Sequence, residues 1–264
     1  MNFEFLSAGK IVFGPGRAEA LGQLAASFGK RALLVTGRST ERSRFAEDRL
    51  TAAGIDFVVF RVSGEPSTET LERALEVGRA QNAEFVVAFG GGSAIDLGKA
   101  IAALLPATGS VFDHLEVVGK GRPLDVPALP VIAVPTTSGT GAEVTKNAVL
   151  TSLEHRVKVS LRHESMLPRI ALVDPRLTLG LPADITAATG LDALTQCRLS
   201  FVCNAAQPLT DAIAFEGLQR GARSLWRGVR HGDDETARTD LSLCSLFGGL
   251  ALATAAKDFA RLSA

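Results

Sequence analysis

Short apolar runs alternate with helical patterns through the first half of the chain, and no other feature of the sequence constrains its fold as strongly. Four runs are apolar and long enough for one strand each, namely residues 31–36, 56–62, 84–89 and 130–134. The segments around them space leucine and alanine as helices do, over residues 17–29, 41–53, 67–82 and 94–105. The run at residues 31–36 has no polar alternation, which indicates a strand that is buried on both faces. Strands and helices in this order predict a parallel sheet with right-handed crossovers.

The second half of the chain has a different pattern. After Asp174-Pro175 the short apolar runs stop, and long helical patterns occupy residues 182–203, 208–228 and 234–255. Pro182 and Pro208 stand where a helix can begin, because proline fits the first helical position. The sequence therefore predicts an α/β half joined to the start of an all-helical half.

Composition and charge exclude several classes of protein. The chain has 264 residues, and 46% of them are hydrophobic, which allows a sizeable core and excludes a disordered chain. With 28 basic and 28 acidic residues the formal charge is zero, so we expect neither a nucleic acid nor a membrane surface as partner. The sequence shows no signal-peptide pattern and no apolar run of membrane-spanning length, which indicates the cytoplasm. The three cysteines include no Cys-x-x-Cys pair, so no thiolate zinc site is indicated.

A glycine loop (residues 90–93) follows the third apolar run. It reads Gly90-Gly91-Gly92-Ser93, and Asp96 lies three residues further on, in the next helix. Glycines allow a phosphate to approach the backbone, and the helix N-terminus offers free N–H groups to it. A tight turn without any ligand is the alternative. The motif is neither the dinucleotide fingerprint G-x-G-x-x-G nor the phosphate loop G-x-x-x-x-G-K-[ST].

A threonine loop (residues 135–145) follows the fourth apolar run and carries several hydroxyl groups and two glycines. Such a loop can hydrogen-bond a diphosphate, a ribose or an amide. The alternative is a polar loop whose hydroxyls cap the next segment. Both loops follow predicted strands, and ligands of parallel sheets bind at the carboxyl ends of the strands.

Asp192 and Gln196 lie four residues apart on a predicted helix and therefore share one of its faces. Two oxygen ligands at that spacing could hold part of a divalent metal site, and an ordinary polar pair on a solvated face is the alternative. The four histidines include no pair at His-x-x-x-His spacing. A Gly-x-Ser-x-Gly elbow is absent, so a serine hydrolase has no support.

In their order along the chain, these segments resemble the iron-containing (group III) alcohol dehydrogenase family. The matching motifs are residues 13–16, 90–99, 135–145, 174–175 and 189–194. The similarity covers about residues 1–253, nearly the whole chain. Dehydroquinate synthase, a lyase on a similar fold, is a further alternative, but its glycine loop normally reads differently.

The resemblance implies an α/β fold in which a Rossmann-like, parallel-sheet dinucleotide-binding domain, residues 1–178, precedes an incomplete all-helical domain for metal and substrate, residues 179–264. NAD or NADP would lie in the cleft between them, beside a divalent metal such as iron or zinc. The implied activity is hydride transfer between a small-molecule alcohol and an aldehyde or ketone, in which the metal binds the alcohol oxygen. A homodimer is implied as well.

The implied site follows from the residues that match the family's motifs. The glycine loop would surround the pyrophosphate, the threonine loop would line the adenosine or ribose, and Lys158 would reach the ribose. The implied cofactor-binding residues are Gly37, Gly91, Gly92, Ser93, Asp96, Thr136, Thr137, Thr140, Thr145 and Lys158. The implied metal ligands are Asp192 and Gln196.

The resemblance also bears on cofactor choice. Family members often carry an acidic residue after the strand that ends in Val-Thr, where it binds the 2′-hydroxyl of the adenosine and repels a 2′-phosphate. Here Thr36 is followed by Gly37 and Arg38, so the carboxylate is replaced by a glycine with a cation beside it. We therefore expect NADP to be accepted or preferred.

Two departures from the family limit the transfer of function. Family members usually carry histidine where Gln196 stands, and an amide is a weaker ligand. They also continue beyond residue 264 with helices that carry two more histidine ligands, so the chain resembles a truncated version. We therefore do not expect a stable metal site from this chain alone. A catalytically impaired, nucleotide-binding remnant of the family is the alternative function.

Overall fold

The computed structural model describes residues 2–204 and 207–259. Within them, six parallel strands form one sheet in the order β1-β8-β5-β4-β2-β3. The strands are β1 (Lys10–Phe13), β2 (Arg31–Thr36), β3 (Asp56–Arg61), β4 (Phe85–Gly90), β5 (Val131–Pro135) and β8 (Ile170–Val173). The four predicted strands are all present, and the parallel sheet confirms the predicted fold class.

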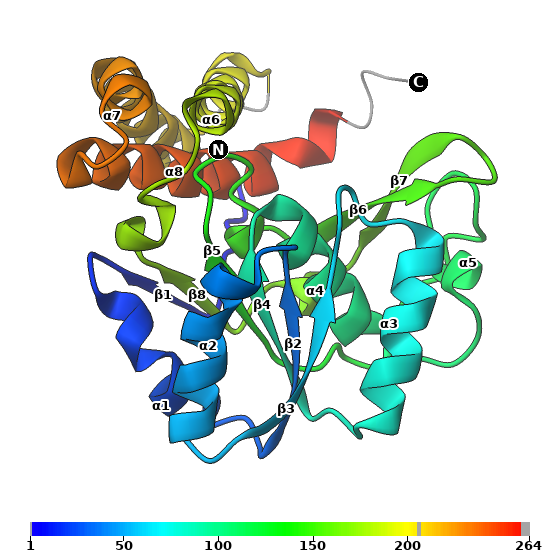
Figure 1. Cartoon of the computed structure of the whole chain (residues 1–264). Coiled ribbons are helices and arrows are strands. Elements are labelled where there is room, and N and C mark those ends of the chain that lie inside the picture. The colour runs from blue at the N-terminus through cyan, green and yellow to red at the C-terminus, as the bar shows by residue number, and fades with distance from the viewer. Residues whose placement is uncertain (1, 205–206, 260–264) are drawn as a thin grey trace.

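Helices cover both faces of this sheet (Figure 1). One face packs against α1 (Leu21–Ala25) and α2 (Thr40–Ala52), and the other against α3 (Thr68–Ala80) and α4 (Gly92–Leu104). Serine side chains cap two of these helices. Ser39 accepts a hydrogen bond from the Arg42 N–H at 3.3 Å at the start of α2, and Ser67 accepts one from the Thr70 N–H at 3.2 Å at the start of α3.

A hairpin that the sequence analysis did not identify follows the threonine loop. Strands β6 (Asn147–Ser152) and β7 (Val157–Arg162) pair antiparallel, outside the main sheet. In the sequence, the short helix α5 (Val111–His114) precedes this hairpin, and a 3₁₀ helix (Glu164–Met166) follows it. Alternate residues of β6 are buried, which is the pattern of a strand with one covered face.

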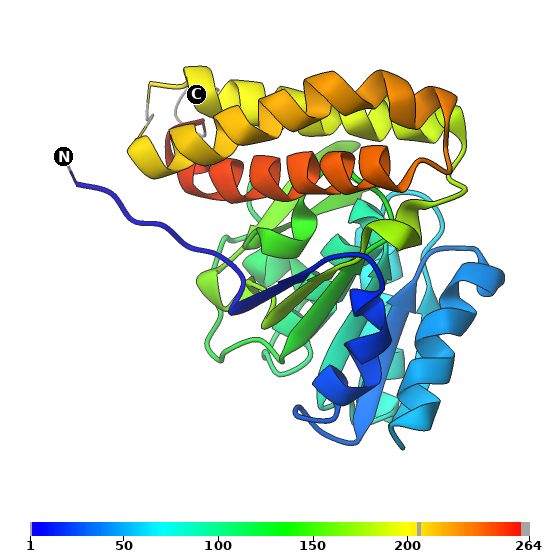
Figure 2. The same ribbon diagram turned by 90° about the vertical axis from the view of Figure 1, so that its left-hand side faces the viewer.

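Three long helices form a layer over the carboxyl ends of the strands (Figure 2). They are α6 (Ala183–Val202), α7 (Pro208–Arg230) and α8 (Glu235–Phe259), and α8 lies between the sheet and the other two. Pro208 occupies the first turn of α7, as predicted, and the Gln207 side chain caps that helix by accepting from the Leu209 N–H at 2.9 Å. The division at residues 178 and 179 into two domains stays a prediction.

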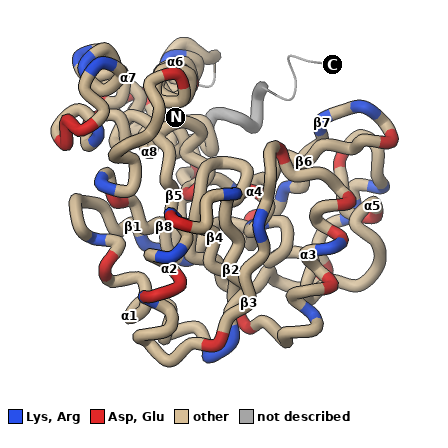
Figure 3. Tube along the Cα trace, viewed as in Figure 1, with Lys and Arg blue, Asp and Glu red and all other residues tan. Residues whose placement is uncertain are grey.

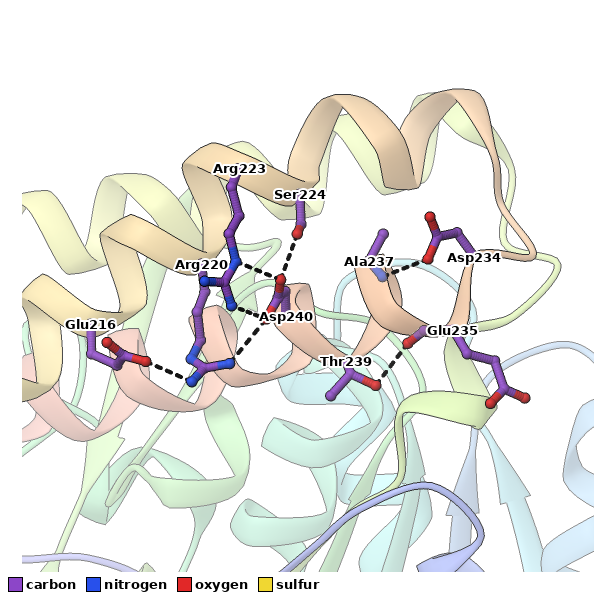
Figure 4. A network of polar contacts seen from close by, with 9 residues as sticks. All are labelled: Glu216, Arg220, Arg223, Ser224, Asp234, Glu235, Ala237, Thr239 and Asp240. Carbon is purple, nitrogen blue, oxygen red and sulfur yellow. Dashed lines mark hydrogen bonds and ion pairs between the residues drawn. The ribbon is translucent and has the colours of Figure 1, made fainter.

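A buried carboxylate joins α7 to α8 (Figure 4). Asp240 on α8 accepts hydrogen bonds from Arg223 Nε and Nη2, both at 2.8 Å, from Arg220 Nη1 at 3.0 Å and from Ser224 Oγ at 2.6 Å. The bidentate bond from Arg223 is the largest cause that lowers the pKa of Asp240, to about 2. Glu216 forms an ion pair with Arg220 at 2.6 Å, so the cluster of charges is closely balanced.

Charges of both signs are interspersed along the trace (Figure 3). This distribution agrees with the zero formal charge. Among the described residues, no helix is both long and apolar enough to cross a membrane.

Candidate cofactor site

The glycine loop and the threonine loop lie side by side at the carboxyl edge of the sheet. They follow the neighbouring strands β4 and β5, and the Thr136 N–H donates to the Gly90 carbonyl at 2.9 Å. A Cβ atom added to Gly92 would lie 2.9 Å from Thr140 Oγ1, closer than side chains normally approach. The two loops therefore pack directly on each other, and that packing requires glycine.

The glycine loop leads straight into α4. Gly91 is the N-cap residue and Gly92 is the first residue of the helix, with Ser93 behind it. The first N–H groups of a helix have no partner within the helix and carry a partial positive charge. The end of the loop is consequently suited to an anion such as a diphosphate. Thr137 stands next to it, because a Cβ on Gly91 would lie 3.2 Å from Thr137 Oγ1.

Two adjoining cavities lie beside these loops. The smaller, of about 120 Å³, lies between the glycine loop and the end of β2, and its lining includes Gly37, Arg38, Gly91 and Thr136. The larger, of about 510 Å³, shares Arg42 and Thr136 with it and extends to Leu177 and Leu179. The smaller cavity is lined mainly by glycines and polar side chains, with Phe89 as its apolar wall, and the larger one mixes apolar residues with Arg42, Arg176 and Glu41.

The surroundings of Gly37 contain cations and open space. A Cβ atom on Gly37 would meet no other atom within 4 Å, so the position has room for a ligand. Arg38 is exposed at the rim of the smaller cavity. Arg42 lines both cavities and donates to the carbonyl oxygens of Leu177 at 3.2 Å and Leu179 at 3.3 Å. No carboxylate lines the smaller cavity among the described residues.

Asp96 and Thr145, both predicted to bind the cofactor, lie together around a lysine. Asp96 Oδ1 is 3.0 Å from Lys99 Nζ, and Asp96 Oδ2 accepts from the Val149 N–H at 3.0 Å. Thr145 Oγ1 accepts from the same ammonium at 2.9 Å. The sequence analysis gave Lys99 no role, although its position three residues after Asp96 on a helix was a readable signal for an ion pair.

Lys158 lies on β7 and forms an exposed ion pair of 2.6 Å with Glu65, which follows β3. It lines neither of the two cavities. Its role toward a cofactor ribose stays a prediction.

The two predicted metal ligands are both on α6, with different surroundings. Gln196 is buried, its Nε2 donates to the Gly139 carbonyl at 3.4 Å, and its Oε1 has no partner. Asp192 is exposed. Among the described residues, no group of three or more His, Cys, Asp or Glu side chains is placed to hold a metal. An orphaned amide oxygen and one carboxylate are fewer than the three protein ligands of a catalytic zinc site, so these residues do not complete one.

Glu143, which the sequence analysis also gave no role, is buried in the threonine loop with 2% exposure. Burial raises its pKa from 4.5 to about 7, and the charge of Lys99 opposes that rise. Between pH 4.5 and pH 7 the carboxyl group releases its proton in the unfolded chain but keeps it in the folded protein. The folded state therefore loses stability as the pH rises through this range.

We therefore expect Glu143→Gln to stabilise the protein at pH 8 but not at pH 4.5. The difference in pKa means that, relative to the wild type, the free energy of unfolding of the variant should rise by on the order of 3 kcal/mol between pH 4.5 and pH 8. Melting temperatures of the wild type and the variant at several pH values measure it, with the exposed Glu76→Gln on α3 as the matched control. Parallel curves for wild type and Glu143→Gln would contradict the buried titration.

Comparison with known proteins identifies the family. Residues 8–175 match the profile of iron-containing alcohol dehydrogenases, and residues 186–260 match the profile of the C-terminal part of that family. The chain belongs to the iron-containing alcohol dehydrogenase family. This confirms the resemblance found in the sequence, and the family's arrangement of a Rossmann-like part and a helical part agrees with the fold described above.

Individual members of this family are similar over most of the chain. The 1,3-propanediol dehydrogenase of Citrobacter freundii is 36% identical over 94% of this chain and 65% of its own length. The 4-hydroxybutyrate dehydrogenase of Cupriavidus necator is 38% identical over 84% of this chain and 58% of its own length. This chain therefore spans about three fifths of these relatives.

Solved structures of the family superpose closely. A crystal structure of 1,3-propanediol oxidoreductase has a TM-score of 0.91 at 33% identity, covering 97% of this chain and 67% of that one. The sulfoacetaldehyde reductase of Bifidobacterium kashiwanohense in complex with NAD⁺ has a TM-score of 0.90 at 33% identity, covering 96% of this chain and 68% of that one.

Proposed function

We propose that this iron-containing alcohol dehydrogenase homologue takes part in hydride transfer between a small-molecule alcohol and the corresponding aldehyde or ketone, with NAD or NADP as hydride carrier. The observation that carries the proposal is the close contact of the glycine and threonine loops at the carboxyl edge of the sheet, beside a cavity. Relatives named as alcohol dehydrogenases, and a structural neighbour bound to NAD⁺, support it.

The residues of this chain would bind and orient the cofactor. When bound, the nicotinamide accepts or donates the hydride, which the protein itself cannot do. The first turn of α4 and the hydroxyls of Thr136, Thr137 and Thr140 would hold the diphosphate and the adjoining ribose. The layer of α6 and α8 over the loops would exclude water from that region. We assign no step to a metal, because the described residues do not complete a metal site.

The test is turnover by the purified chain. NADH or NADPH oxidation is followed by absorbance with a series of short aldehydes, and the reverse reaction with 1,3-propanediol and 4-hydroxybutyrate, each with and without Fe²⁺ or Zn²⁺. Cofactor-dependent turnover supports the proposal. Tight cofactor binding without turnover under any of these conditions would contradict it, and would favour the alternative of a nucleotide-binding remnant.

We expect the chain to bind NADPH more tightly than NADH, because Arg38 and Arg42 lie beside the open position at Gly37. Gly37→Asp should reverse this order. A carboxylate close to the 2′-phosphate weakens NADPH binding about tenfold or more, whereas NADH binding is kept or strengthened, because the same carboxylate can accept a hydrogen bond from the 2′-hydroxyl. Dissociation constants for both dinucleotides, from nicotinamide fluorescence titrations, measure the effect.

The matched pair Arg38→Ser and Arg44→Ser controls for general loss of positive charge. Arg44 is exposed on α2 and lines neither of the two cavities. Arg38→Ser should weaken NADPH binding alone, and Arg44→Ser should change neither constant. A wild-type preference for NADH would refute the expected preference for NADPH, but it would not contradict the proposed hydride transfer.

The proposal includes a cytoplasmic location and a homo-oligomer. The zero formal charge supports a small-molecule substrate in place of a nucleic acid or membrane partner. Sedimentation of the purified chain measures its oligomeric state.

A further inference from the structure

We propose that Lys99 is a positioning residue of the cofactor site, whose ammonium group holds the glycine loop, the threonine loop and the β6–β7 hairpin in register. The inference rests on the function proposed above, because it concerns the same site. Neither the sequence motifs nor the comparison with relatives assigns a role to this side chain.

The ammonium of Lys99 is completely enclosed, with 0% exposure, on a helix whose other buried residues are almost all apolar. Nζ donates to the Ala142 carbonyl at 2.9 Å and to Thr145 Oγ1 at 2.9 Å, and Asp96 Oδ1 lies 3.0 Å away. An ammonium has three N–H groups, and these three partners can accept one each, with the Thr145 carbonyl at 3.5 Å as a further, weaker acceptor. The charge is therefore fully satisfied although it has no contact with water.

The three partners come from different segments that border the site. Asp96 belongs to α4, the helix that begins with the glycine loop, whereas Ala142 and Thr145 belong to the end of the threonine loop. Asp96 also holds the backbone of Val149 in β6, so the hairpin that carries Lys158 is connected to the same group. The ammonium thus ties α4 directly to the end of the threonine loop, and Asp96 extends this connection to the hairpin.

The place at which the Lys99 ammonium holds the threonine loop affects the contact between the two loops. The threonine loop is held at its start by the pairing of β5 in the sheet, and Lys99 holds its end. Thr137 and Thr140, which stand opposite Gly91 and Gly92, lie between these two attachments. Without the ammonium, the end of the loop loses its direct bonds to α4, and the two threonines are held less firmly over the glycines.

Stability alone does not account for a buried lysine at this place. An apolar side chain on a buried helix face avoids the desolvation cost of an ammonium, and such replacements are often neutral or stabilising when both partners are changed. A charge that bonds three backbone and side-chain oxygens in different segments fixes their relative positions, which apolar packing does less specifically. Besides Asp96, the carboxyl of Glu143, which is buried on the same loop and influenced by the charge of Lys99, faces this site.

The test compares Lys99→Met and Thr145→Val with Lys120→Met. Lys120 forms an exposed ion pair with Asp113 at 2.7 Å and provides the same chemical change away from the site. Hydrogen–deuterium exchange of residues 136–149 is measured without cofactor, and the dissociation constant for NADPH is measured by fluorescence, both well below the melting temperature. Thr145→Val keeps the shape of the side chain and removes one partner of the ammonium, so the test does not depend on the folding of Lys99→Met.

Lys99→Met should raise exchange of residues 136–149 selectively and weaken NADPH binding about tenfold at unchanged stoichiometry, because hydrogen bonds to a charged group are lost. Thr145→Val should give a smaller change of the same kind, and Lys120→Met none. Unchanged exchange in this segment would overturn the inference. So would a uniform rise over α6 and α7, which is the signature of a purely structural role. If the wild type binds no dinucleotide, the proposed function fails, and the exchange experiment alone decides the role of Lys99.

Discussion

Gly249→Ala is expected to lower the melting temperature by about 3 °C and to weaken cofactor binding about tenfold, because it forces α8 away from the threonine loop. The backbones of Gly249 and Gly141 are in direct contact. A Cβ atom on Gly249 would lie 2.8 Å from Gly141 Cα and 2.9 Å from Val144 Cγ2, and it would also collide with the Gly141 carbonyl. Overpacking of this kind costs about 2 kcal/mol, which exceeds the gain of about 1 kcal/mol from alanine in a helix.

The neighbouring residue provides a matched control. Gly248→Ala gives the same gain in helix propensity, but its Cβ would keep at least 3.2 Å from the atoms of α6 that it faces. Thermal unfolding and NADPH titration of both variants separate the effect of the contact with the threonine loop from the effect of alanine on helix propensity. A stabilised Gly249→Ala protein with unchanged cofactor affinity would show that α8 does not constrain the loop.

Asp240→Asn is expected to reduce the free energy of unfolding by about 3 kcal/mol at neutral pH, because breaking a buried charge pair leaves its partners uncompensated. Arg220 and Arg223 retain some access to water, with side-chain exposures of 27% and 57%, so the cost lies at the lower end of the range for buried pairs. Urea unfolding measures it. Asp233→Asn, an exposed carboxylate in the turn before α8, is the matched control.

The effect of Asp240 depends on pH with a defined sign. Its pKa is lowered on folding, from 3.8 to about 2, so the folded state gains from the ionised form. That contribution is complete above pH 4 and is lost as the pH falls toward 2, by about 2 kcal/mol. The difference between wild type and Asp240→Asn should therefore shrink on acidification. A difference that stays constant from pH 7 to pH 2 would contradict this origin.

Apolar runs were sufficient to predict most of the main sheet, because β2, β4 and β5 are buried along most of their length and therefore carry mostly apolar residues, whereas the edge strand β3 is only partly buried. The hairpin β6–β7 escaped detection for the opposite reason. Only alternate residues of β6 are covered, and two of the three, Ala148 and Ser152, are too small to stand out in a sequence. Burial does alternate along β6 with a period of two, but the matching alternation of apolar and polar residues in the sequence is weak.

The candidate site was predictable in its loops but not in its interior. Glycines and threonines after consecutive strands indicated the edge of the sheet where they meet, since parallel strands share one carboxyl edge. The sequence could not show that Thr145 bonds to Lys99, because burial of a lysine depends on segments that are 46 residues apart. Nor could helical spacing show that Gln196 is buried while Asp192 is exposed, since that depends on how α6 lies against Gly139.

The backbone contact between Gly141 and Gly249 makes the cofactor site and the helical layer thermodynamically dependent on each other. A ligand that fixes the threonine loop also fixes the surface on which α8 rests, so part of its binding free energy appears as stability of helices that it does not contact. For the dinucleotide binding proposed above, the relation is reciprocal: a partner that packs more firmly against α8 from the far side would raise affinity for the dinucleotide by the same factor. A partner of α6, α7 or α8 would in this sense be an allosteric effector of a site formed by two loops of the sheet.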